Sequence, residues 1–107
     1  MLYRTMGPTG RPVSAIGFGG MRFRAIDDRG ACAAALERAL ALGITYYDTA
    51  AGYFGGKSEE RFGDVLADRP VWISTKSGAA DGVGLRRDLE RSLRRLRRPR
   101  VDVFHIW

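Results

Sequence analysis

The sequence of 107 residues has a single cysteine, Cys32, and only two lysines. It also lacks any apolar run close to the roughly 20 residues that a membrane helix requires. One cysteine excludes an internal disulfide framework and is typical of proteins in a reducing cytosol. The first residues, Met1–Arg4, contain no hydrophobic signal-peptide segment. We therefore expect a cytoplasmic protein without a membrane partner.

Positive charge is concentrated in one segment. The formal net charge is +6, and residues 85–100 alone hold eight arginines against two acidic residues. In this segment Leu85, Leu89, Leu93 and Leu96 recur at helical spacing, which predicts a helix with a solvated arginine face that Pro99 ends. No aromatic residues are interleaved for stacking on bases. We therefore expect no specific nucleic-acid partner, with a basic nucleic-acid-binding module as the alternative.

Apolar runs and helical patterns alternate along the chain. A turn-rich link at Gly7–Gly10 predicts a hairpin between residues 3–5 and 12–14. Strands are predicted at 15–18, 44–47, 71–74 and 101–106, and helices from Asp28 to Gly43, from Ser58 onward and over 85–96. The order is a hairpin followed by βαβαβαβ, which predicts an α/β fold with a parallel sheet and right-handed crossovers.

The glycines after the first predicted strand do not fit a dinucleotide-binding Rossmann fold. Arg22 stands where the third glycine of the Gly-x-Gly-x-x-Gly pattern belongs. The remaining interpretation is a (β/α)8 TIM barrel, which typically takes about 250 residues. We therefore expect residues 1–107 to form only the N-terminal half of one barrel domain.

The residues that carry chemistry follow the second and third predicted strands. Asp48 and Tyr53 lie five residues apart in Asp48-Thr49-Ala50-Ala51-Gly52-Tyr53, and Lys76 ends the next apolar run. In barrels the active site lies at the carboxyl ends of the strands, where these side chains can meet. A phenol, whose ordinary pKa is about 10, donates a proton near pH 7 only if a cation lowers that pKa. Together the three predict an acid–base site for a carbonyl.

Several motifs resemble the aldo-keto reductase family: Asp48-Thr-Ala-x-x-Tyr53, Ser58-Glu59, Thr75-Lys76 and the opening 13–21. The resemblance implies an NADPH-dependent oxidoreductase that reduces aldehydes or ketones to alcohols. It implies that Tyr53 is the general acid, that Lys76 lowers its pKa and that Asp48 holds Lys76. By the same resemblance Gly20, Met21, Arg22 and Asp48 line the nicotinamide end of the cofactor site, and no metal is needed. Ser58-Glu59-Glu60 is interpreted as the start of a helix.

The family also uses a histidine that orients the carbonyl, and His105 is the only histidine. The family pattern puts this histidine about five residues after the leading Asp of the strand, here Asp102, and Trp107 stands there. His105 would share its face of the strand but lie one layer deeper, roughly 6–7 Å away. Either His105 acts from a shifted register or Trp107 replaces it.

Two alternatives remain open. One is a non-catalytic barrel that binds a nicotinamide cofactor as a sensor or regulatory subunit, and the other is a truncated inactive fragment. We expect a chain of these residues alone to be a poor catalyst, because the resemblance puts most cofactor contacts in the second half of the barrel. Substrate, preference for NADPH over NADH, and oligomeric state are not determined by the sequence.

Overall fold

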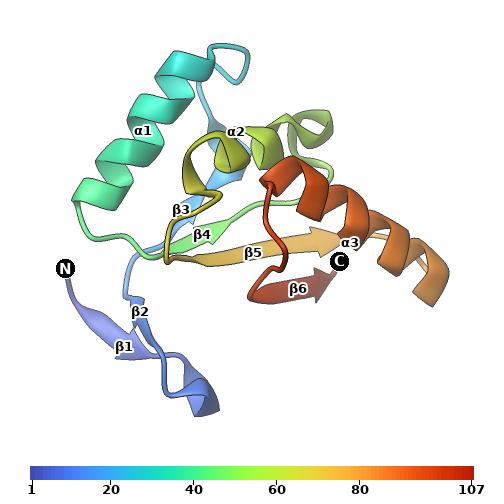
Figure 1. The fold of residues 1–107 in the computed structure, drawn as a ribbon, viewed down its shortest axis with the longest axis horizontal. Coiled ribbons are helices and arrows are strands. Elements are labelled where there is room, and N and C mark those ends of the chain that lie inside the picture. The colour runs from blue at the N-terminus through green and yellow to red at the C-terminus, as the bar shows by residue number, and fades with distance from the viewer.

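A computed structural model describes all residues of the chain, 1–107. A two-stranded hairpin lies near the amino ends of a four-stranded parallel sheet, and three α-helices cover one face of that sheet (Figure 1). The hairpin pairs β1 (Tyr3–Thr5) with β2 (Pro12–Ser14). The sheet contains β3 (Phe18–Gly19), β4 (Tyr46–Asp48), β5 (Trp72–Ser77) and β6 (Val103–Ile106), and the helices are α1 (Arg29–Ala41), α2 (Lys57–Leu66) and α3 (Gly82–Leu96).

Strand order in the sheet follows the chain, β3-β4-β5-β6, and every neighbouring pair is parallel. Three short 3-10 turns complete the fold: η1 (Gly7–Thr9), η2 (Gly20–Arg22) and η3 (Tyr53–Gly56). The predicted order of a hairpin followed by alternating strands and helices is therefore confirmed. None of the helices has the length and apolar character needed to cross a membrane.

The apolar core lies between the sheet and the helices. Its buried residues come from all three helices, from β4 and β5 and from the residue just before β5: Leu36, Ala39, Tyr47, Phe62, Leu66, Val71, Ile73 and Leu96. The ring of Phe62 packs edge-on against that of Tyr47, with centroids 6.0 Å apart. Burial raises the pKa of Tyr47 to about 12, and its hydroxyl donates to the carbonyl of Ile44. Tyr47 is therefore a core residue with no capacity for acid chemistry near neutral pH.

Capping residues fix the helix starts. Asp28 accepts a hydrogen bond from the backbone N–H of Ala31 at the start of α1, and Asp81 accepts one from Gly84 at the start of α3. Gly43 follows α1 with a φ of 84°, a conformation that favours glycine.

Several predicted boundaries were wrong. The helix α3 ends at Leu96 as predicted, where Arg97 adopts a left-handed conformation with φ 53°, but it begins at Gly82 rather than at Leu85 because Asp81 caps it. Strand β4 is Tyr46–Asp48 rather than 44–47, and β6 is Val103–Ile106 rather than 101–106. The first strand of the parallel sheet is Phe18–Gly19 rather than 15–18. Before it, the hydroxyl of Ser14 donates to the carbonyl of Ile16, so side-chain hydrogen bonds replace the strand ladder there. The third predicted strand, 71–74, continues to Ser77 because β6 pairs along its whole carboxyl half.

Candidate active site

The candidate residues gather where the parallel strands end. Asp48 is the last residue of β4, and Tyr53 begins the η3 turn that follows. Lys76 lies near the end of β5 and is paired in register with His105 of β6. The fold therefore brings all four residues to one edge of the sheet, the edge at which barrel enzymes carry their active sites.

An ion pair joins β4 to β5 at this edge. The ammonium Nζ of Lys76 lies 2.9 Å from both carboxylate oxygens of Asp48 and 2.6 Å from the backbone oxygen of Thr49. The side chains are 14% and 36% exposed, respectively. Because all three ammonium hydrogens have an acceptor, the position of Lys76 is fixed by β4.

Tyr53 lies beside this pair and is half-buried. The Nζ of Lys76 is 5.0 Å from the centroid of the Tyr53 ring, so the cation rests over the face of the phenol. The indole of Trp107 packs edge-on against the same ring, with centroids 6.0 Å apart. Tyr53 is thus held between a cation and an aromatic side chain.

His105 and Trp107 take different places on β6 and just beyond it. The imidazole Nε2 of His105 lies 3.1 Å from the hydroxyl of Ser74, and that hydroxyl lies 2.8 Å from Asp48 Oδ1. The backbone N–H of Trp107 donates to Ser77, and its side chain is 68% exposed beside Tyr53. Trp107 therefore occupies the place next to the phenol, and His105 lies one layer deeper, against Ser74.

The η2 turn, Gly20–Arg22, reaches the same edge from β3. Met21 and Arg22 are exposed, whereas Gly20 is buried. A Cβ on Gly20 would lie 2.3 Å from the hydroxyl of Ser58, which donates to the Gly20 carbonyl. The same Ser58 hydroxyl is 2.8 Å from that of Thr49. The candidate cofactor turn is therefore fixed to the segment that carries Asp48.

A second ion pair, which the sequence did not reveal, lies on the opposite face of β5. Glu59 of α2 is fully buried and accepts hydrogen bonds from Thr75, at 2.7 Å, and from Arg95 of α3, at 3.2 Å. The interpretation of Ser58-Glu59-Glu60 as only a helix start was incomplete. Glu59 precedes Phe62 and Leu66 by three and seven residues, and this shared helical face was the available signal.

Arg95 also contacts the turn that carries Tyr53. A Cβ on Gly56 would lie 2.3 Å from the guanidinium carbon of Arg95, and Gly56 has a φ of 97°. The left-handed backbone conformation favours glycine at this position, and a side chain there would displace the guanidinium of Arg95. The guanidinium of Arg95, which Glu59 holds in place, therefore packs against the η3 turn.

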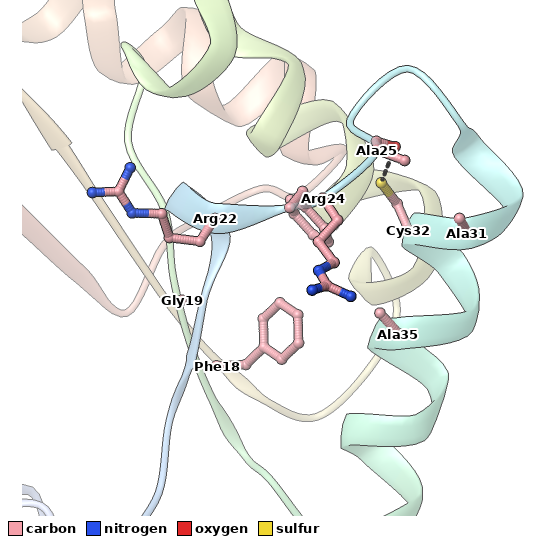
Figure 2. A pocket seen from close by; sticks show the side chains of 9 residues that line it. Phe18, Gly19, Arg22, Arg24, Ala25, Ala31, Cys32 and Ala35 are labelled. Atoms are coloured by element: carbon pink, nitrogen blue, oxygen red, sulfur yellow. Dashed lines mark hydrogen bonds between the residues drawn. The ribbon is translucent and has the colours of Figure 1, made fainter.

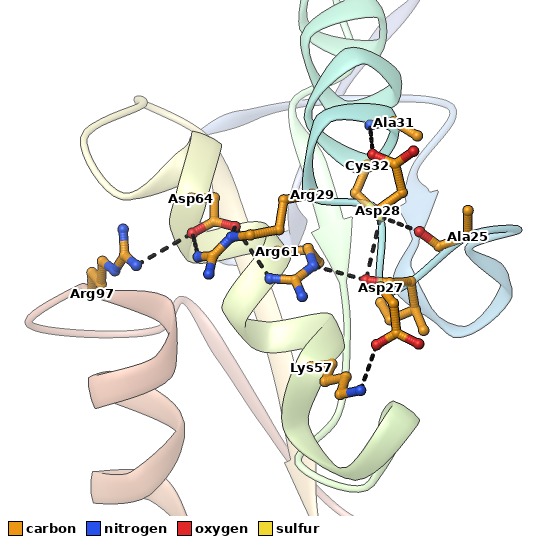
Figure 3. A network of polar contacts seen from close by, with 11 residues as sticks. Ala25, Asp27, Asp28, Arg29, Ala31, Cys32, Lys57, Arg61, Asp64 and Arg97 are labelled. Atoms are coloured by element: carbon orange, nitrogen blue, oxygen red, sulfur yellow. Dashed lines mark hydrogen bonds and ion pairs between the residues drawn. The ribbon is translucent and has the colours of Figure 1, made fainter.

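The prediction of a solvated arginine face was wrong for Arg95 and Arg98, which are partly buried, whereas Arg97 is 59% exposed and holds an ion pair at the surface. Arg97 pairs with Asp64, which also binds Arg29 of α1 and Arg61, so one carboxylate links the three helices (Figure 3). Burial would raise the pKa of Asp64, but the hydrogen bond and charge of Arg29 outweigh it and hold that pKa below its ordinary value. Arg98 donates to the carbonyls of Leu66 and Arg69.

Two cavities lie near the candidate residues. One, of about 440 Å³, is lined by Lys76 and Trp107 and by Arg87 and Arg91 of α3. The other, of about 340 Å³, lies between η2 and α1. Cys32 is one of the residues that line it, and in Figure 2 its thiol is directed at the carbonyl of Ala25, to which it donates at 3.3 Å. Burial raises the pKa of this thiol, so the second cavity contains no reactive cysteine.

Comparisons with known proteins agree on one family. The family model described as "Aldo/keto reductase family" matches residues 15–106. Aflatoxin B1 aldehyde reductase member 2 of Rattus norvegicus is 38% identical over 89 residues, which is 74% of this chain and 24% of the relative. The chain thus spans about a quarter of the length of that curated relative.

Solved structures give the same result at the level of the fold. The aldo-keto reductase AKR11C1 from Bacillus halodurans superposes with a TM-score of 0.88 at 28% identity, over 99% of this chain and 40% of the other. An aldo-keto reductase from Klebsiella pneumoniae in complex with NADPH superposes with a TM-score of 0.81 at 30% identity, over 99% and 39%. The four strands and three helices therefore correspond to the N-terminal half of a TIM barrel.

Proposed function

The chain belongs to the aldo/keto reductase family, and on this premise we propose that residues 1–107 are the N-terminal half of a barrel that reduces aldehydes or ketones to alcohols with NADPH. The observation that carries the proposal is the cluster of Asp48, Lys76 and Tyr53 at the carboxyl ends of β4 and β5. An aldehyde reductase and an NADPH complex among the similar proteins support the substrate class and the cofactor.

Tyr53 is the proposed general acid, which gives its hydroxyl proton to the carbonyl oxygen of the substrate. The hydroxyl of the buried Tyr47 is held by a backbone carbonyl, whereas Tyr53 lies beside Lys76 and is partly open to solvent. The positive charge of Lys76 near the ring stabilises the phenolate that remains after proton transfer. Asp48 holds Lys76 in place and balances its charge.

NADPH would supply the hydride that is added to the carbonyl carbon. The residues proposed for its nicotinamide end are Gly20, Met21 and Arg22 of η2, together with Asp48. The turn fits such a group because a Cβ on Gly19 would meet no atom within 4 Å, so the space beside the turn is open. The exposed side chain of Met21 offers an apolar surface to a flat ring there.

The test is NADPH consumption by the intact protein with 4-nitrobenzaldehyde, comparing wild type with Tyr53→Phe. We expect the substitution to lower kcat by about 10²–10⁴-fold, the range of general acid catalysis, while NADPH binding measured by fluorescence is retained. Tyr3→Phe is the matched control, since Tyr3 donates to Gly43 far from the site. A Tyr53→Phe variant with the rate of wild type would refute the proposed role.

Trp107 favours one second candidate, a non-catalytic barrel that binds the cofactor as a sensor or regulatory subunit. The indole of Trp107 lies beside Tyr53, where the family pattern puts a histidine. An indole N–H is a weaker donor to a carbonyl oxygen than an imidazolium, so the substrate would have one strong donor fewer. Wild-type protein that binds NADPH but reduces no aldehyde or ketone would support this candidate over the reductase.

A further inference from the structure

Ser74 of β5 connects two of the candidate residues. Its side chain is completely buried, and its hydroxyl lies 2.8 Å from Asp48 Oδ1 and 3.1 Å from His105 Nε2. Lys76, two residues later on the same face of the strand, binds the two oxygens of the same Asp48 carboxylate. The three strands β4, β5 and β6 are thereby joined by one continuous chain of polar contacts.

The direction of each hydrogen bond follows from the groups involved. Asp48 faces an ammonium at both oxygens, so it is the ionised carboxylate and can only accept. The hydroxyl of Ser74 must therefore donate its one hydrogen to Asp48. It has only lone pairs left for His105, so His105 must carry a hydrogen on Nε2 and donate it to Ser74.

We propose that Ser74 is a positioning residue of this site, and that His105 acts on Asp48 through Ser74 rather than on the substrate carbonyl. The proposal rests on the reductase function proposed above. The Nε2–H of His105 is used within the protein, and Trp107 rather than His105 packs on Tyr53.

The physical reason lies in the freedom of the Asp48 carboxylate. Asp48 ends its strand and is 36% exposed, so without a further donor the carboxylate can rotate and turn one oxygen toward water. Donation from Ser74 to Oδ1 opposes that rotation and keeps both oxygens directed at Lys76. Donation from His105 polarises the Ser74 hydroxyl and strengthens its hydrogen bond to the carboxylate.

The test is a double-mutant cycle in the intact protein, with kcat and KM measured for NADPH-dependent reduction of 4-nitrobenzaldehyde. Ser74→Ala removes one hydrogen bond to a charged group and is expected to lower kcat by about tenfold, with the KM of the aldehyde unchanged. His105→Ala removes the donor that orients the Ser74 hydroxyl toward Asp48, so a loss of the same size is expected. The double variant should be no slower than either single variant, because both changes interrupt one chain of contacts. His105→Gln, whose amide N–H can donate to Ser74, should recover part of the rate.

Ser92→Ala is the control, because Ser92 is equally buried but its hydroxyl has no hydrogen-bond partner. Its kcat should equal that of wild type. Effects of Ser74→Ala and His105→Ala that multiply, or a raised aldehyde KM in His105→Ala alone, would mean that His105 acts directly on the substrate and would overturn the proposal. An unchanged kcat in Ser74→Ala would overturn it as well.

A spectroscopic measurement tests the hydrogen bond from His105 to Ser74 without depending on reductase activity. Long-range ¹H–¹⁵N spectra at pH 8.5, assigned with His105→Ala, should show neutral His105 with its hydrogen on Nε2, and Ser74→Ala should shift that signal. A hydrogen on Nδ1 would overturn the proposal even in an active enzyme. If wild type reduces no carbonyl compound, the proposed function fails, and the same spectra still decide whether Ser74 links His105 to Asp48.

Discussion

Strand β5 separates two ion pairs of the same chemistry. On one face, Lys76 pairs with Asp48, and the hydroxyl of Ser74 supports the carboxylate. On the other face, Arg95 pairs with Glu59, and the hydroxyl of Thr75 supports the carboxylate. The carboxylate of the first pair is 36% exposed, and that of the second is fully buried.

This difference assigns the two pairs different roles. The Asp48 carboxylate is open to solvent beside an accessible phenol, so this pair can meet a substrate, and Asp48 can turn to water when Lys76 is lost. The Glu59 carboxylate is sealed between a strand and two helices, so it can meet no substrate, and loss of Arg95 leaves a buried charge without its partner. We therefore expect substitutions on the first face to change catalysis and those on the second to change stability.

The largest effect is expected from Lys76→Met, which removes the cation beside Tyr53. The rate kcat/KM for an aldehyde should fall by about 10³-fold, within the range of lost acid–base catalysis. The midpoint of urea unfolding should change little, since Asp48 can turn to water. Lys57→Met is the control, because Lys57 pairs with Asp27 at the surface. A strongly lowered urea midpoint would mean that the pair of Lys76 and Asp48 stabilises the fold, which would contradict its assignment to catalysis.

The next effect is expected from Glu59→Gln, which breaks the buried pair. The free energy of unfolding should fall by about 3 kcal/mol, the lower end of the range for a buried pair that loses one partner, because Arg95 is 23% exposed and can turn partly to water. Glu60→Gln, an exposed neighbour on α2, is the matched control and should be close to neutral. Urea unfolding of both variants provides the comparison, and equal stabilities would show that burial of Glu59 is not what separates the two faces.

Gly63→Ala tests the packing behind the second pair. A Cβ there would lie 2.3 Å from the backbone oxygen of Arg95, so α2 and α3 would have to separate. We expect a loss of about 1–3 kcal/mol of unfolding free energy, typical of overpacking. Gly82→Ala is the control, because a Cβ on Gly82 meets no atom within 4 Å. If Gly63→Ala were as stable as Gly82→Ala, the two helices would not be in the close contact described.

The smallest effect is expected at the Asp64 cluster, where two of the three arginine partners, Arg29 and Arg97, are mostly solvated and only Arg61 is buried. The folded-state pKa of Asp64 lies below its ordinary value of 3.8, so the cluster stabilises the fold above that pH. Asp64→Asn should cost less than about 1 kcal/mol at pH 7. The difference from wild type should shrink as the pH falls through the folded-state pKa. Thermal unfolding at pH 7 and pH 3 measures it, and a difference that grows in acid would contradict this account.

The sequence predicted the pair of Asp48 and Lys76 on one face of β5, but it did not predict the pair of Glu59 and Arg95 on the other face. Asp48, Tyr53 and Lys76 stand at strand ends within short motifs, and parallel strands bring such ends together. Glu59 and Arg95 are 36 residues apart on two helices, and nothing in the local sequence distinguishes Arg95 from the seven other arginines of its segment. The link from Ser74 to His105 depends on the register of β5 against β6, which hydrophobic patterns do not fix.

The comparison is tested most directly by measuring NADPH-dependent aldehyde reduction in Lys76→Met and Arg95→Met, each as the intact protein at a temperature at which circular dichroism shows it folded. The account predicts that Lys76→Met loses about 10³-fold in kcat/KM, whereas folded Arg95→Met keeps a rate within a few-fold of wild type. Equal losses in the two variants would contradict the division of roles across β5.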